Sequence, residues 1–355
     1  MTVTVYRIPT EQPEADGTLA WDATTLVLVE LQAGGQRGLG YTYAHAAAAI
    51  LIDDLLSAAI HGRDAFDIPG AWLAMVRAIR NLGRPGISSM AISAVDIAMW
   101  DLKGKLLGVS VADLLGAVRE RVPLYGSGGF TSYSIDDLCA QLAGWVADGI
   151  GRVKMKVGAD PQQDVKRVAA ARQAIGVAAE LFVDANGAYD VKQALAFAER
   201  FADRGVSWFE EPVSSDDLHG LRTLRLRAPA GMEISAGEYG YDDVYFRNML
   251  GAGSVDVLQA DATRCGGISG FMHAAALCEA YQVPLSSHTA PCAHLHACCA
   301  AVPLRHLEYF HDHVRIEQLL FEGAARPHQG HLAPMRERPG LGIELRARVA
   351  EPYRI

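Results

Sequence analysis

The sequence lacks the features that mark several specialised classes of protein. No apolar run reaches the eighteen or so residues of a membrane span, so we expect no membrane partner. The start, MTVTVYRIPT, has neither the basic nor the apolar region of a signal peptide, which predicts a cytoplasmic protein. Basic residues are in deficit, 32 against 41 acidic ones, and the net charge of −9 argues against nucleic acid as a partner.

Cysteines are few and scattered, with six in 355 residues. Without a secretory context, reduced thiols are a better interpretation than a disulfide framework. The segment CAHLHACC (292–299) contains residue types that bind zinc. It also reads as one helix of small residues, and a structural zinc site usually needs two paired clusters of ligands. We therefore favour the helix.

From about residue 122 onward, short apolar runs alternate with amphipathic helical patterns. Eight such strands separated by helices predict an α/β fold, a parallel (β/α)₈ barrel. The alternative is an open doubly wound sheet, which usually carries a glycine-rich nucleotide loop after its first strand, and YGSGGF does not match that pattern. The predicted strands are 122–125, 152–157, 180–185, 206–211, 233–236, 255–260, 283–288 and 305–310.

The residues before the barrel follow a different pattern. TTLVLVEL and QRGLGYTYA, joined by QAGG, predict a hairpin, and helices are expected at 45–60, 70–81 and 88–107, the last ending in a glycine stop signal. We therefore predict an α+β domain at 1–115 and a barrel domain at 116–320. The tail, 321–355, is rich in Pro, Gly and Arg, and we expect it to pack back on the first domain.

Ionisable residues recur at the ends of the predicted strands. In a βα barrel the catalytic groups gather at the C-terminal ends of the strands, where side chains from separate strands converge. A repeated placement of this kind indicates an active site, although any single residue would be weak evidence. The residues are Lys154 and Lys156 (strand two), Asp184 (three), Glu210 and Glu211 (four), Glu238 (five), Asp261 (six), His288 (seven) and Glu308 (eight).

Three carboxylates from neighbouring strands, Asp184, Glu210 and Glu238, predict a divalent cation with oxygen ligands, and Mg²⁺ fits best. Adjacent residues of a strand face opposite sides, so only one of Glu210 and Glu211 can be a ligand. We choose Glu210, and we expect Glu211 to form an ion pair behind the site.

Two further groups could move protons. Lys154 and Lys156 share one face of a strand, and a second cation with Mg²⁺ nearby would lower the pKa of a lysine enough to make it a base. We assign the base to Lys156 and the holding of a substrate carboxylate to Lys154. His288 could take or give a proton on the other side if Asp261 fixes one of its ring nitrogens.

These motifs together resemble the enolase superfamily, in particular its mandelate racemase/muconate lactonizing enzyme-like proteins of the mandelate racemase subgroup, over nearly the whole chain. The matching stretches are AISAVDIAMWDLKGK (91–105), KMK (154–156), DANG (184–187), EEP (210–212), AGE (236–238), DATRCGG (261–267), SSH (286–288) and LEYF (307–310).

The resemblance implies a modified, enolase-type barrel with a capping domain that the C-terminal tail completes. It implies one Mg²⁺ held by Asp184, Glu210 and Glu238, with Lys156 as base and His288, oriented by Asp261, as acid/base. It further implies that Glu308 and Lys154 contact the substrate carboxylate and that Asn186 contacts a substrate oxygen. The loop at 10–25 would close over the barrel and read the far end of the substrate.

The implied activity is abstraction of the proton next to a substrate carboxylate, through a metal-stabilised enolate. We favour dehydration of a sugar acid, an aldonate or aldarate, to a 2-keto-3-deoxy acid. The alternative is racemisation or epimerisation of an α-hydroxy acid, and a barrel that binds a ligand without turnover is a minor one. The expected partner is thus a small carboxylate substrate, and we expect a homo-oligomer.

Overall fold

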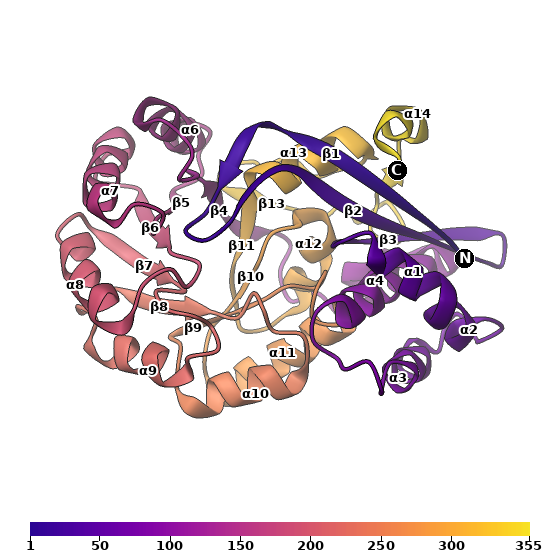
Figure 1. The fold of residues 1–355 in the computed structure, drawn as a ribbon. Coiled ribbons are helices and arrows are strands. Elements are labelled where there is room, and N and C mark those ends of the chain that lie inside the picture. Colours follow the sequence, from indigo (N-terminus) through magenta and orange to yellow (C-terminus); the bar gives the residue numbers. More distant parts are fainter.

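The computed structural model describes all 355 residues and contains a closed barrel of eight parallel strands (Figure 1). Its last strand pairs in parallel with its first, which closes the sheet. The strands are almost wholly buried, as expected when helices cover the outside of a parallel sheet. They are β4 (Val122–Gly128), β5 (Arg152–Lys156), β6 (Glu180–Asp184), β7 (Val206–Glu210), β8 (Glu233–Ala236), β9 (Val257–Ala260), β10 (Leu285–Ser287) and β11 (Leu304–Phe310).

A helix follows each barrel strand. Several of these helices begin at a side-chain cap, such as Asp190, which accepts a hydrogen bond from the Gln193 amide while the Gln193 side chain bonds back to it. The eight predicted strands and the barrel they imply are confirmed. The helices are α6 (Ile135–Ala147), α7 (Pro161–Ile175), α8 (Val191–Ala202), α9 (Leu218–Arg227), α10 (Asp243–Ala252), α11 (Gly267–Tyr281), α12 (Pro291–Ala300) and α13 (His311–Leu320).

The N-terminal unit combines a three-stranded antiparallel sheet with helices, as predicted. The predicted hairpin forms with a two-residue turn at Gly34 and Gly35, both at positive φ, as a tight hairpin turn requires. The strands are β1 (Thr2–Ala15), β2 (Ala20–Ala33) and β3 (Gln36–Tyr43), and the helices are α1 (Ala47–Leu51), the π-helical turn η1 (Ile52–Leu56), α2 (Ser57–Ile60), α3 (Ile68–Ala78), α4 (Ile87–Leu107) and α5 (Val111–Leu115).

Helix α4 joins the N-terminal unit to the barrel. On one side it lies so close to β3 that a side chain at Gly40 would come within 2.3 Å of the Ala94 carbonyl oxygen, so only glycine fits there. On the other side it packs against α11 of the barrel, where Ser269 donates to Asp96 at 2.6 Å and Trp100 donates to Ser269 at 3.0 Å. The most buried helix of the cap is thus fastened to the barrel by polar contacts.

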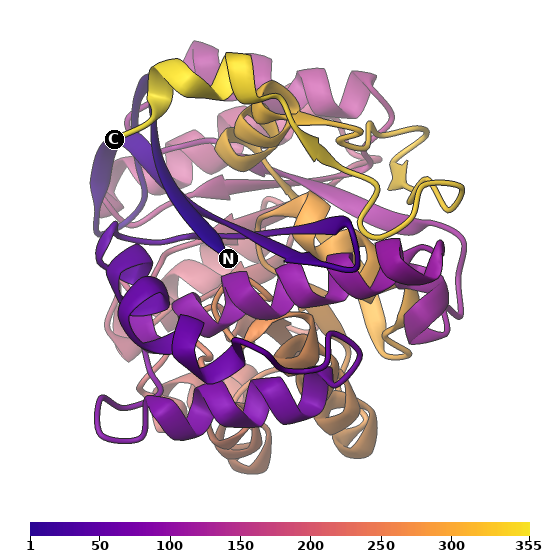
Figure 2. The same ribbon diagram turned by 90° about the vertical axis from the view of Figure 1, so that its right-hand side faces the viewer.

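The segment at 10–25 is mostly paired strand and not the loop that we expected. Residues up to Ala15 continue β1 and residues from Ala20 begin β2, with only a short turn between them. The prolines at positions 9 and 13 obscure this strand in the sequence, but β1 is an edge strand and its pairing shifts register between Pro9 and Glu14. The result is a long hairpin that reaches over the barrel (Figures 1 and 2).

The C-terminal tail touches both parts of the molecule. Its strand β13 (His331–Leu332) pairs antiparallel with β4 at the edge of the barrel sheet, and β12 (Phe321–Glu322) pairs with β14 (Glu344–Leu345). The last turns, α14 (Ala347–Ala350) and η2 (Glu351–Tyr353), lead to the Ile355 amide, which donates to the Val5 carbonyl of β1. Figure 2 shows the two chain ends on the same side of the molecule. No helix is long and apolar enough to span a bilayer.

Candidate active site

The C-terminal ends of neighbouring strands bring the predicted residues together. Lys156, Asp184 and Glu210 each end their strand and lie side by side in the sheet, because β5, β6 and β7 pair in parallel with these three residues in register. Glu238 follows β8, and Asp261, His288 and Glu308 lie at or near the ends of β9, β10 and β11. All seven side chains are buried.

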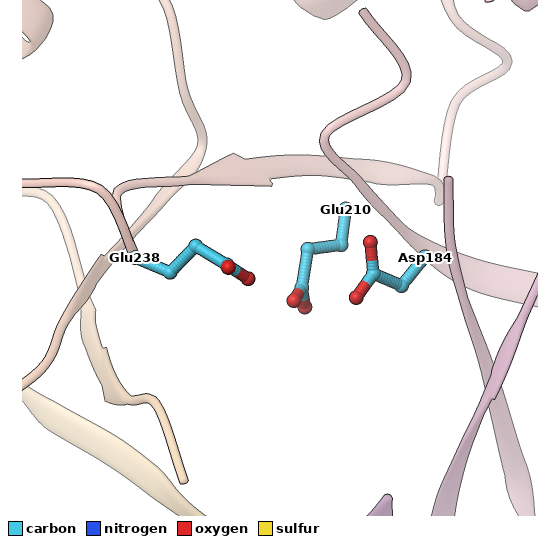
Figure 3. A group of neighbouring side chains, drawn as sticks. All are labelled: Asp184, Glu210 and Glu238. Atoms are coloured by element: carbon cyan, nitrogen blue, oxygen red, sulfur yellow. The ribbon is translucent and has the colours of Figure 1, made fainter. Parts of the chain in front are cut away.

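Asp184, Glu210 and Glu238 form a compact group of carboxylates (Figure 3). Each offers one oxygen, and the three oxygens lie within 4.8 Å of one another. The Oε2 atom of Glu238 is buried without a hydrogen-bond donor, which is costly for a polar atom unless a ligand completes it. Three buried carboxylates with one oxygen left over fit a hard divalent cation such as Mg²⁺.

Burial raises the pKa values of Glu210 and Asp184 in this triad, while the two lysines lower them. Burial and the neighbouring Asp184 carboxylate raise the pKa of Glu210, although Lys154 opposes that effect. For Asp184, burial acts in the same direction, but Lys156 and Lys154 outweigh it and hold the pKa below its ordinary value. Packing like charges this closely is unfavourable without cations among them, which is a common signature of a functional site.

Both lysines lie against the triad. The ammonium of Lys154 is 2.6 Å from Glu210 Oε1, 2.8 Å from Glu308 Oε1 and 3.6 Å from Asp184 Oδ2. It also lies 5.2 Å above the ring of Tyr125. The ammonium of Lys156 is 2.5 Å from Asp184 Oδ2. The two lysines that share a face of β5 are therefore compensated by three carboxylates from other strands.

The carboxylates around Lys156 act against the lowered pKa that we expect with Mg²⁺ nearby. Burial and the Lys154 ammonium do lower the pKa of Lys156, as the sequence suggested, but Asp184, Glu238 and Glu210 raise it further, and the net pKa lies above its ordinary value. The expected lowering comes from Lys154 and Mg²⁺, whereas the ion pair with Asp184 acts in the opposite direction. A metal ion that engages Asp184 would compete with Lys156 for the same carboxylate, and this competition acts toward the lower pKa that a base needs.

Glu211 does not form the ion pair that we expected. It is not part of the carboxylate triad, no lysine or arginine pairs with it, and its Oε1 atom is buried without a donor. Its backbone φ of 36° is strained for a residue with a side chain. Burial and the neighbouring Glu238 raise its pKa well above the ordinary value, which favours the neutral acid.

His288 and Asp261 form the predicted dyad. The Nδ1 atom of His288 is 2.8 Å from Asp261 Oδ2, and its Nε2 atom is 3.3 Å from Glu238 Oε2. Burial alone would lower the pKa of His288, but Glu238 and Asp261 raise it above its ordinary value. The hydrogen bond from His288 also holds the pKa of Asp261 below its ordinary range against the effect of burial. One ring nitrogen is therefore fixed and the other is presented to the triad.

Glu308 and Asn186 complete the predicted set. One oxygen of Glu308 pairs with Lys154, and the other accepts the backbone N–H of Thr289 at 2.7 Å. Asn186 has a left-handed φ of 47° and donates its backbone N–H to Asp184 at 2.9 Å. Its side-chain Oδ1 is buried without a donor. A substrate hydroxyl is a suitable partner for this oxygen.

A cavity of about 540 Å³ connects the strand ends to the cap. Its floor includes Lys156, Asn186, Glu238, His288 and Glu308. The β1–β2 hairpin and the end of β3 provide the opposite wall, so the cap shapes the space in which a ligand would lie. The wall residues from the cap are Asp16, Leu19, Trp21, Ala23, Thr24, Thr25, Tyr43, Ala44 and His45.

Sequence reasoning missed several residues of the site. Arg264, inside the motif DATRCGG, lies 3.3 Å from Glu238 Oε1 and 3.6 Å from Asp261 Oδ2, and it lines the cavity. His313 also lines the cavity and stacks on Tyr43 with ring centroids 3.5 Å apart. Arg264 had a signal in its motif, whereas only the tertiary fold brings His313 to Tyr43.

Family models match both parts of the chain. The model described as Mandelate racemase / muconate lactonizing enzyme, N-terminal domain, matches residues 1–116, and the model described as Enolase C-terminal domain-like matches residues 137–349. The chain belongs to the mandelate racemase/muconate lactonizing enzyme family of the enolase superfamily. The resemblance inferred from the motifs is thereby confirmed.

Solved structures of this family superpose closely on the chain. A mandelate racemase/muconate lactonizing enzyme-like protein from Rubrobacter xylanophilus has a TM-score of 0.98 and 52% identity, covering 100% of this chain and 98% of its own. A racemase from Streptomyces coelicolor A3(2), solved with bound magnesium, has a TM-score of 0.92 and 32% identity, covering 100% and 99%.

Relatives within this family carry out reactions on sugar acids. The 3,6-anhydro-alpha-L-galactonate cycloisomerase of Streptomyces coelicolor is 35% identical over 349 residues, 96% of this chain and 95% of its own. The L-talarate/galactarate dehydratase of Salmonella typhimurium is 31% identical over 331 residues, 90% of this chain and 80% of its own. The relatives thus share a superfamily but differ in the reaction.

Proposed function

We propose that this family member is a Mg²⁺-dependent enzyme that removes the proton next to a substrate carboxylate and dehydrates a sugar acid to a 2-keto-3-deoxy acid. One observation carries the proposal. Lys156 contacts Asp184 and His288 contacts Glu238, so two proton-carrying groups approach the carboxylate triad from its two ends, with Glu210 between them (Figure 3). Both line the same cavity as the Glu238 carboxylate.

The triad of Asp184, Glu210 and Glu238 would hold the metal. When bound there, Mg²⁺ supplies positive charge that stabilises the negative charge developing on the substrate carboxylate as the neighbouring C–H bond breaks. Lys154 adds a fixed cation on the same side, because it bridges Glu210 and Glu308 within 2.8 Å of each. Glu308, on the floor of the cavity, would contact the substrate carboxylate together with the Lys154 ammonium that it pairs with.

The proton transfers are assigned to Lys156 and His288. Lys156 Nζ accepts the α-proton, and the electron pair of that C–H bond first moves into the substrate carboxylate to give the enolate. In a second step this electron pair forms the carbon–carbon double bond as the β-hydroxyl departs. His288 Nε2 gives the departing hydroxyl its proton, so that water leaves, and the resulting enol rearranges to the 2-keto acid. Asp261 keeps the His288 ring in place through Nδ1, which leaves Nε2 directed toward the cavity.

The walls of the cavity support a hydroxylated substrate. Thr24, Thr25 and Tyr43 provide hydroxyl groups on the cap side, and the unpartnered Oδ1 of Asn186 faces the same cavity from the barrel side. Hydroxyl and amide groups of this kind suit a polyol acid better than an aryl one. The dehydratase and cycloisomerase among the relatives act on sugar acids by name, which agrees with this choice.

Racemisation or epimerisation is the second candidate, since the same two groups favour it. If His288 returned a proton to the α-carbon in place of protonating the β-hydroxyl, the configuration would invert. The magnesium-containing neighbour from Streptomyces coelicolor is described as a racemase. The two outcomes differ only in which atom His288 reaches, and this depends on the pose of the substrate against the cap.

An exchange experiment in D₂O tests the proposal. Purified protein is incubated with Mg²⁺ and a panel of sugar acids and α-hydroxy acids, and both α-proton exchange and 2-keto acid are measured. We expect exchange together with 2-keto acid for at least one sugar acid, and neither without the metal. Exchange with inversion and no 2-keto acid would favour the racemase. No exchange with any acid would contradict both and favour a barrel that only binds ligands.

A further inference from the structure

The turn after β10 is strained at two consecutive residues. Thr289 and Ala290, which directly follow His288, have φ values of 49° and 39°. A β-branched residue in this region is a rare outlier, and such strain persists only where the surrounding structure holds it. Glu308 holds one part of the turn by accepting the Thr289 N–H. The position of His288 therefore also depends on the contacts that hold Ala290, the second residue of the turn.

The backbone N–H groups of Ala293 and His294 in α12 donate to the Ala290 carbonyl, and the His294 side chain adds a contact that reaches beyond this turn. This histidine is fully buried, and its Nδ1 atom is 2.9 Å from the carbonyl oxygen of Ala290 in the strained turn. Its Nε2 atom is 2.7 Å from the backbone nitrogen of Ala262, the residue next to Asp261. One imidazole ring thus spans the turn that carries His288 and the turn that carries Asp261.

The hydrogen bonds also determine the protonation of this ring. A backbone N–H can only donate, so Nε2 of His294 must be an acceptor without a proton, and Nδ1 must carry the proton that it donates to Ala290. The ring is neutral in this arrangement, and burial lowers its pKa in the same sense. Because Nε2 carries no proton, its distance of 3.6 Å to Asp261 Oδ1 is not an ion pair, and that oxygen accepts from Thr263 instead.

We propose that His294 is a positioning residue, which clamps the loops bearing Asp261 and His288 so that the two keep the hydrogen bond between them. It touches no predicted metal ligand and does not line the cavity, so it acts through the dyad and carries no proton in the reaction. The proposal rests on the proposed function for its effect on catalysis, but the effect on the dyad itself is independent of any substrate.

The same helix provides a matched control. His296 is equally buried and also makes two bonds to backbone, accepting the Ala112 N–H at 3.1 Å and lying 3.1 Å from the Leu341 carbonyl oxygen. Those partners belong to the cap and the tail and not to the dyad. A substitution of His296 therefore removes a buried histidine with two backbone bonds and leaves the loops of Asp261 and His288 as they are.

The first readout is the proton that His288 donates to Asp261, observed by NMR as a downfield ring N–H signal in full-length protein. We expect His294→Leu to lose or broaden this signal, His294→Gln to retain part of it because an amide can both donate and accept, and His296→Leu to keep it. A signal unchanged in His294→Leu would overturn the proposal. If His294→Leu does not fold, His294→Phe takes its place, because it keeps a ring and removes both hydrogen bonds, and an unchanged signal there would overturn the proposal equally.

The second readout is the partition of the substrate between α-proton exchange and product. Exchange depends on Lys156, whereas product needs His288 as well, so a displaced dyad should lower product formation by about 10- to 100-fold and leave exchange nearly unchanged. A merely structural role would lower both together, as we expect for His296→Leu. A wild-type protein that turns over no acid would refute the proposed function, while the NMR comparison would still decide the role of His294.

Discussion

Glu14 offers a quantitative test of how the hairpin is held over the barrel. Its side chain lies on β1 and is fully buried, with Oε2 accepting the Trp21 indole N–H at 3.0 Å and Oε1 without any donor. Burial and the nearby Asp312 carboxylate raise its pKa from 4.5 to about 8, although Trp21 and Arg315 oppose this and Glu11 adds to it. The folded protein therefore keeps Glu14 protonated at neutral pH.

The pKa of Glu14 is higher in the folded protein than in the unfolded chain, and this difference makes stability depend on pH. Below pH 4.5 the carboxyl is protonated in both states and contributes nothing, whereas between about 4.5 and 8 the unfolded chain releases a proton that the folded protein retains. Stability is thus lost as pH rises through this window. A shift from 4.5 to about 8 corresponds to roughly 5 kcal/mol. For 355 residues the unfolding entropy is roughly 0.7 kcal/mol per degree, so the change in Tm is about 7 °C.

The perturbation is Glu14→Gln, which keeps an oxygen for Trp21 and removes the titration. We expect the Tm of the variant relative to wild type to rise by about 4 to 7 °C between pH 5 and pH 9, as followed by calorimetry at both pH values. The comparison at pH 5 removes any cost of the amide itself. A pH-independent difference for Glu14→Gln would refute the reasoning.

Two further predictions concern the catalytic groups. Lys156→Ala and His288→Asn should each lower turnover by about 10²- to 10⁴-fold. The Mg²⁺ affinity of each variant, measured by calorimetry, should stay nearly intact, because neither residue is a ligand. Near wild-type turnover in either variant would make the two-base assignment wrong. Asp184→Asn should weaken Mg²⁺ binding strongly, since it removes a charged ligand and leaves Lys156 without its partner. Glu211→Gln, next to a ligand but outside the triad, should bind the ion as wild type does. Equal loss in both variants would argue against the triad.

The sequence predicted the barrel well because its signals are local. Each barrel strand is a short apolar run, each is followed by an amphipathic helix, and the ionisable residues stand at fixed places relative to the strand ends. In a barrel, that place along the strand decides where a side chain lies. Asp184, Glu210 and Glu238 are far apart in the chain, yet the pairing rules alone bring their oxygens together.

Other features depended on contacts that no local pattern reveals. The β1–β2 hairpin contains prolines that argue against a strand, and it forms because an edge strand tolerates them. The ion pair of Lys156 with Asp184 could not be weighed against Lys154 without distances. The ring of His294 on α12 joins the turn at Ala290 to the turn at Ala262, and no local pattern reveals the second contact, which spans 32 residues of sequence.

The sequence by itself thus determined the architecture and the identity of the charged side chains at the mouth of the barrel. The reason is that the hydrophobic periodicity of a strand or a helix depends only on residues close together in the sequence. Only the tertiary structure decided how those charges balance, which wall the cap gives the cavity, and what holds His288 in its strained turn. These depend on distances of a few ångströms between distant residues, and both the electrostatic energy and the hydrogen bonds change steeply over such distances.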